Sequence, residues 1–177
     1  MNGSSPGRPW VKFLLVLISL SIAAFWVWAL FFPPSKQSVA KVTDEAWTER
    51  AEAICRRANE ERDLLTDLRR VSDAGPDALT ERAELIEQAT DIIEIMVADV
   101  MSETLALAED RAIASQWADM YTTLIADRRI YIAQVRDGAN GAFAETTIDG
   151  APISEYINDF TVANRMKSCS APLDLAV

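Results

Sequence analysis

The 177-residue sequence contains no histidine, and its only lysines are Lys12, Lys36, Lys41 and Lys167. Without an imidazole, histidine-activated serine or cysteine nucleophiles are excluded, and the commonest zinc ligand is missing. The chain also lacks a glycine-rich phosphate loop, a nucleophile elbow and a Cys-x-x-Cys pair. We therefore expect a protein that is not an enzyme and that has no cofactor and no metal.

Acidic side chains are absent from the first part of the chain and abundant in the rest. All 27 Asp and Glu residues lie from Asp44 onward, together with 13 of the 17 basic residues, so this part has a net charge of −14. Such a charge repels nucleic acid and anionic lipid headgroups. We expect no nucleic-acid partner.

One long apolar run interrupts the otherwise polar sequence. Residues 13–32 contain no charged residue, no glycine and no proline. As a helix they would be about 30 Å long, which matches the hydrocarbon layer of a membrane, so we predict a transmembrane helix. Residues 1–12 carry Arg8 and Lys12 but no acid, which favours a cytoplasmic tail and a C-terminal domain outside the cytoplasm.

Residues 33–42 are predicted to be a linker, because Pro33 and Pro34 stop the helix and polar residues follow. Ser38 and Ala40 also fit the small-residue pattern of a signal-peptide cleavage site, so cleavage after Ala40 is an alternative. We favour an uncleaved signal anchor, because the apolar run is longer than the usual ~7–15 residues of a signal peptide.

Apolar residues recur at helical spacing through most of residues 43–177. The pattern predicts long helices from about 44 to 72, 77 to 104 and 109 to 138, and a shorter one from 152 to 164. Residues 139–151 lose this periodicity and are predicted to be a loop, with a short extended piece within 143–148. Because the connections are short, we predict an all-α fold: an antiparallel bundle of about four helices after the transmembrane helix.

Cys55 and Cys169 are the only cysteines. Two thiolates without histidine make an incomplete metal site, so a disulfide is the better interpretation if the domain lies outside the cytoplasm. Counting along the predicted helices places both sulfurs at similar heights in the bundle. Inside the cytoplasm, free thiols would be expected instead.

The second predicted helix carries a row of carboxylates at spacings of three and four, namely Glu84, Glu87, Asp91 and Glu94. Such a ladder can bind a hard cation such as Ca²⁺. We favour ion pairs with the first helix, with Arg62 near Glu87 and either Arg56 or Arg57 near Glu94.

Two charged residues interrupt apolar stripes: Glu61 in the first helix and Arg128 in the third. Both would lie about 26–28 Å along their helices, so we predict that they meet as a buried ion pair. A structural pair is favoured over a binding pocket. Trp47 and Trp117 have the spacing of core residues, which is favoured over a cofactor-binding role.

Three segments, AWTERAEAICRRANEERDLL, DRRIYIAQV and FTVANRMKSCSAPLDL, are similar to a recurrent type of actinobacterial membrane protein. That type has one N-terminal span and an extracytoplasmic helical domain. The resemblance implies this location and a disulfide, and it implies no activity.

These features favour a membrane-anchored, non-catalytic interaction protein, which would be an accessory or scaffold subunit of a membrane or cell-envelope complex. Its expected partners are the membrane and another membrane or envelope protein. An extracytoplasmic ligand- or cation-binding sensory module, acting with a signalling partner, is the alternative. An enzyme that uses carboxylates alone, as glycosidases do, is the third possibility.

Overall fold

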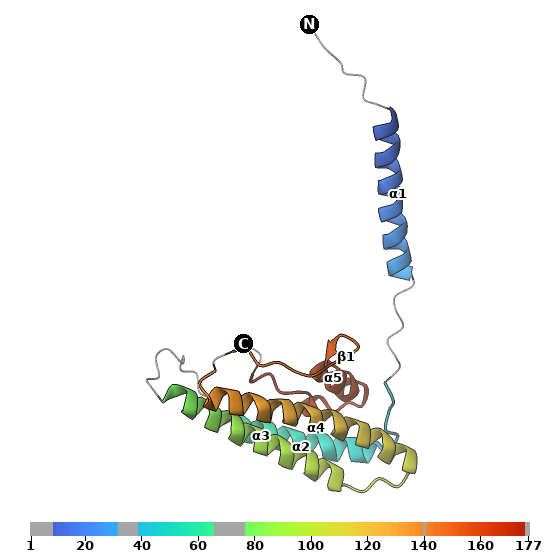
Figure 1. The fold of residues 1–177 in the computed structure, drawn as a ribbon. Coiled ribbons are helices and arrows are strands. Elements are labelled where there is room, and N and C mark those ends of the chain that lie inside the picture. The colour runs from blue at the N-terminus through green and yellow to red at the C-terminus, as the bar shows by residue number, and fades with distance from the viewer. Residues whose placement is uncertain (1–8, 32–38, 66–76, 140, 176–177) are drawn as a thin grey trace. The chain divides into compact units, whose positions relative to one another are not determined.

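The computed structural model describes residues 9–31, 39–65, 77–139 and 141–175. It divides into a unit that ends at Ser38 and a larger unit that begins at Val39, and each is described on its own. The larger unit consists almost entirely of helices (Figure 1), so the prediction of an all-α fold is confirmed.

Helix α1 spans Pro9–Phe31. It begins four residues before the predicted position, because Pro9 suits the first position of a helix, where its missing N–H is not needed. Its segment Pro9–Trp28 is long and apolar enough to cross a membrane, a property that signal sequences share. Residue 32, the predicted end of the span, lies outside the described residues.

The larger unit contains four α-helices among its described residues: α2 (Glu45–Asp63), α3 (Ala78–Ser102), α4 (Ala108–Arg136) and α5 (Ile153–Ala163). A short 3₁₀ turn, η2 (Lys167–Cys169), follows α5. Helices α2, α3 and α4 are long neighbouring rods, and the shorter α5 lies beside them (Figure 1). Helices α3 and α4 are antiparallel, because Glu87 pairs with Arg136 while Glu94 pairs with Arg129. The predicted helical bundle is confirmed.

Local sequence explains where these helices begin and end. The Asp44 side chain accepts a hydrogen bond from the Trp47 N–H (2.9 Å) and caps α2. Helix α4 ends at Arg136, Gly138 follows with a φ of +90° that suits glycine, and the Ala139 N–H closes the turn on the Gln134 carbonyl. Helix α2 ends at Asp63, before the predicted residue 72, and residues 66–76 lie outside the described part of the chain.

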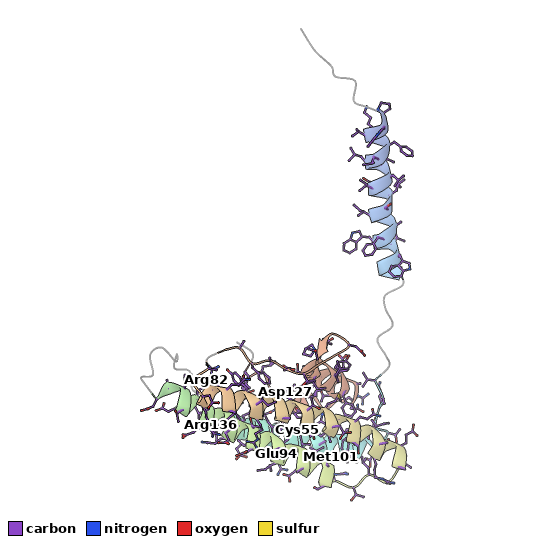
Figure 2. The ribbon with its side chains drawn as sticks, in the orientation of Figure 1. Cys55, Arg82, Glu94, Met101, Asp127 and Arg136 are labelled. Atoms are coloured by element: carbon purple, nitrogen blue, oxygen red, sulfur yellow. A yellow bond between two sulfur atoms is a disulfide. The ribbon has the colours of Figure 1, made fainter. Side chains whose placement is uncertain are left out.

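A two-stranded hairpin occupies part of the predicted loop. Strands β1 (Thr147–Ile148) and β2 (Ala151–Pro152) pair across Asp149 and Gly150, whose φ values of 50° and 85° are typical of a tight hairpin turn. The predicted extended piece is therefore correct at its C-terminal end. The Asp127 carboxylate, labelled in Figure 2, holds the hairpin against α4 by accepting hydrogen bonds from Thr146 N (2.7 Å) and Oγ1 (2.9 Å).

The described residues of the bundle form two apolar clusters. The larger one surrounds the two cysteines and includes the fully buried side chains of Trp47, Val100, Trp117, Ile157 and Met166. The smaller one contains Ala83, Ile86, Tyr131, Ile132, Val135 and Leu175. Both predicted core tryptophans lie in the first cluster, so their assignment to the core is confirmed.

Candidate functional site

A disulfide joins Cys55 of α2 to Cys169 of η2, with an S–S distance of 2.03 Å. Both cysteines have 0% exposed surface. Around the bridge, Glu52 accepts hydrogen bonds from Ser168 N (2.8 Å) and Oγ (2.6 Å), and Asn59 donates to the Ser168 carbonyl (2.8 Å). The predicted disulfide is confirmed, and it fastens the C-terminal part of the chain to α2.

The chain continues from the disulfide as an extended segment, Ser170–Leu175, which we call the C-terminal strap. The Tyr121 hydroxyl lies within hydrogen-bond distance of the Cys169 and Ser170 carbonyls (3.0 and 2.9 Å). The Asn158 side chain accepts a hydrogen bond from the Ala171 N–H (2.9 Å). The strap is thus held by side chains of α4 and α5.

Arg128 of α4 is 1% exposed, and it is the centre of a buried polar site between α4 and the strap. Its two terminal nitrogens donate to the two carboxylate oxygens of Asp174 in the strap (2.9 and 2.8 Å). Its Nε donates to the Thr90 hydroxyl (2.9 Å), which in turn donates to the Ile86 carbonyl (2.6 Å). Every nitrogen of this buried guanidinium therefore has a partner, as buried charges require.

Electrostatics at this site favour the charged form of Asp174. Burial alone would raise its pKa, but the hydrogen bonds and the charge of Arg128, with the charge of Arg62, lower the pKa below its usual value. For the buried Tyr121 beside the strap, burial outweighs the two arginine charges and raises the pKa of the phenol. Asp174 is therefore an anion and Tyr121 a neutral donor at pH 7.

The predicted pair of Glu61 and Arg128 is wrong. Glu61 is exposed on α2, and the carboxylate that faces Arg128 belongs to Asp174. Counting residues gives the height of a side chain along a helix, but it does not give the direction in which the side chain points. The strap lacks helical periodicity, so the prediction did not include its carboxylate.

The carboxylate row on α3 forms ion pairs, although with a different helix from the one predicted. Arg129 of α4 contacts Asp91 (2.5 Å) and Glu94 (2.9 Å), and Arg136 pairs with Glu87. Glu84 is exposed. The predicted pairs with Arg62, Arg56 and Arg57 are therefore wrong for these acids, because α3 turns the row toward α4.

Among the described residues, no group of three or more cysteine, aspartate or glutamate side chains is placed to hold a metal ion. Glu87, Asp91 and Glu94 lie against the guanidinium groups of two arginines of α4, which supply the positive charge that a cation would otherwise bring. The geometry of the row is that of an inter-helix ion-pair network.

A second polar site binds the segment just before α2. The buried Asn164 at the end of α5 accepts from the Val42 N–H (2.8 Å) and donates to the Ala40 carbonyl (3.3 Å). The buried Asp110 in the first turn of α4 accepts from Thr43 N (2.9 Å) and Oγ1 (2.8 Å), and these bonds lower its pKa, the backbone bond most. The bundle therefore begins near Val39, and the predicted boundary at residue 43 falls inside its docked first segment.

Comparisons with protein-family models, curated proteins and solved structures find no match. The roles of the residues in this chain therefore follow from their geometry alone.

Two buried donors lack a partner among the described residues: the indole N–H groups of Trp47 and Trp117. Trp117 stacks on Phe160 with ring centroids 6.4 Å apart and meets Tyr121 edge-on at 5.0 Å. Both indoles lie in the apolar cluster around the disulfide. They contribute buried apolar area to the core at the expense of two unsatisfied N–H groups.

Three polar residues that organise these sites were not predicted: Asp174, Asn164 and Asp110. The signal for Asp174 is visible in the sequence, because it is the one charged residue in an otherwise apolar C-terminal segment. Asn164 and Asp110 lie at helix ends, where polar residues are ordinary. Nothing in the local sequence distinguishes them from exposed capping residues.

Proposed function

We propose that this chain is a membrane-anchored, non-catalytic interaction protein whose helical bundle lies outside the cytoplasm. It would act as an accessory or scaffold subunit of a membrane or cell-envelope complex. Helix α1 is the anchor, and the basic residues Arg8 and Lys12 favour a cytoplasmic N-terminus.

The buried Cys55–Cys169 disulfide is the observation that carries this proposal. Structural disulfides persist in oxidising compartments and are rare in the cytosol. Because the bridge lies in the bundle and an apolar helix precedes the bundle, an extracytoplasmic domain on a single anchor accounts for both features.

The buried charges have structural partners within the chain, which favours a protein that is not an enzyme. Arg128 is paired with Asp174, and Asp110 is bonded to Thr43. Both sites therefore use their charge to join chain segments. The paired carboxylates of α3 likewise give no support to the alternative of a cation sensor.

The location is tested with a thiol reagent that does not cross membranes, applied to intact cells. We expect no labelling of Cys55 or Cys169 before reduction, and labelling of both after reduction and partial unfolding. Labelling without reductant would contradict the disulfide, and no labelling after reduction and unfolding would contradict the outward location.

The interaction is tested by mild detergent extraction and capture through an N-terminal tag, which leaves the strap unmodified. We expect a partner protein in stoichiometric amount with the full chain. A matched control that carries only residues 1–38 separates partners of the anchor from partners of the bundle. Capture of substoichiometric background with both chains would refute the proposal.

A further inference from the structure

The C-terminal strap lies on the bundle as a short peptide lies in a recognition groove. Peptide-binding sites use hydrogen bonds to the main chain for affinity and side-chain pockets for specificity. Here the Tyr121 hydroxyl meets the Ser170 carbonyl, and Asn158 binds the Ala171 N–H. Both contacts are made with main-chain atoms, so they do not depend on the strap's side chains.

Two side chains of the strap occupy matching sites on the bundle. Asp174 places both carboxylate oxygens on the Arg128 guanidinium, which Thr90 holds in position. Leu175 is 7% exposed within the smaller apolar cluster, which includes Tyr131. A planar guanidinium fork recognises a carboxylate in two-point geometry, so the surface under the strap suits an aspartate followed by an apolar residue.

The strap can leave this groove without opening the disulfide. Its described residues contain no helix or strand, and Cys169 precedes it. The Asp174 side chain is 29% exposed and Leu173 is 75% exposed, so solvent reaches this part of the strap, whereas Ala171 and Leu175 are buried. Segments held mainly by side-chain contacts open at lower free energy than the core.

We propose that the groove under the strap is a recognition site for an extended segment of a partner protein that carries aspartate followed by an apolar residue. The strap fills this site as an internal ligand, and the partner segment displaces it. This inference rests on the proposed interaction function and specifies how the partner is bound.

The test uses the full chain in detergent micelles and a fluorescent peptide with the strap sequence SAPLDLAV. The chain carries Asp174→Asn and Leu175→Ala, which weaken the strap and leave both cysteines in place. We expect saturable binding by fluorescence anisotropy. The peptide with Asp174→Asn should bind about 10- to 100-fold more weakly, because a hydrogen bond to a charged group contributes about 1.5–3 kcal/mol.

The unmodified chain is the matched control, and it should bind the peptide at least about tenfold more weakly, because its own strap competes at a high effective concentration. Equal binding to both chains, or equal binding of both peptides, would overturn the proposal. If the variant loses its helical circular dichroism, excess peptide is added to the unmodified chain. It should then accelerate hydrogen exchange at the Ala171 N–H, and unchanged exchange would overturn the proposal.

The groove and the proposed function fail in different ways. A partner captured in stoichiometric amount, with no peptide binding, would overturn the groove and leave the interaction function in place. Strap exchange between two copies is the other source of such a segment. To test this, unmodified and variant chains carry different fluorescent labels and are mixed in shared micelles. If energy transfer between them exceeds that between two unmodified chains, the strap exchanges between copies, and the assignment to a different partner protein is overturned.

Discussion

Replacing Asp174 with asparagine would remove the negative charge that faces the buried Arg128 while preserving the size of the side chain. Removal of one partner of a buried ion pair typically costs about 3–5 kcal/mol, because the remaining charge is left uncompensated. Here Asp174 is 29% exposed, and Thr90 and the asparagine oxygen would still accept hydrogen bonds. We therefore expect a smaller loss, about 2–3 kcal/mol in the free energy of unfolding.

The measurement is urea unfolding of the oxidised full chain in detergent micelles, followed by far-ultraviolet circular dichroism. The control replaces both partners with apolar residues, Arg128→Met with Asp174→Leu. Such replacements of buried pairs are often neutral, so the double variant should be more stable than Asp174→Asn alone. A double variant that is less stable than the single variant would show that Arg128 contributes through contacts other than this pair.

The effect of Asp174→Asn should also depend on pH. The pKa of Asp174 is lowered in the folded chain, so its charge adds stability above the unfolded pKa of about 3.9. That stability is lost as pH falls through the folded pKa. The difference between the two chains should therefore be full at pH 7 and shrink below about pH 4. A difference under about 0.5 kcal/mol at pH 7, or one unchanged in strong acid, would refute the reasoning.

Substitutions at three further places in the bundle test other parts of the fold by the same unfolding measurement. Arg165 has a φ of 58°, so Arg165→Gly should stabilise the bundle by about 1 kcal/mol, whereas Arg165→Ala should not; equal effects would contradict strain at this position. Trp117→Phe removes an N–H that has no hydrogen-bond partner among the described residues, and it should cost less than about 2 kcal/mol, against about 3–5 for Trp117→Ala; similar costs would show that the indole N–H has a partner. Replacing Cys55 and Cys169 together with alanine opens a connection of 114 residues and should cost up to about 4–5 kcal/mol, whereas an unchanged unfolding midpoint would contradict a stabilising bridge.

The features that could be predicted depend on local pattern or on simple chemistry. Helices α3 and α4 follow the apolar spacing closely, because each has one buried stripe, and they end at Ser102 and Arg136, about two residues before the predicted ends. The disulfide could be predicted because the chain offers only one possible pair, Cys55 with Cys169. Neither inference required knowledge of how the helices are rotated against each other.

The errors share one physical cause, which is that the rotation of each helix about its axis is set by packing. The carboxylates of α3 have two neighbouring helices to face, and only the packed bundle determines that Arg129 and Arg136 of α4 meet them. For Arg128, the partner comes from a segment with no periodic pattern. The C-terminal strap and the docked segment before α2 are tertiary features, and local propensity carries little information about them.

Both ends of the bundle are fastened to its inner helices by the same kind of contact. At the N-terminal end, Asn164 of α5 and Asp110 of α4 hold residues 40–43. At the C-terminal end, Arg128 of α4 holds Asp174. The two fastenings differ in one respect that matters for binding. Residues 40–43 continue directly into α2, whereas the described strap contains no helix or strand and follows the disulfide. In the exchange proposed above, the strap is therefore replaced while both cysteines stay joined, and no such exchange is proposed for residues 40–43.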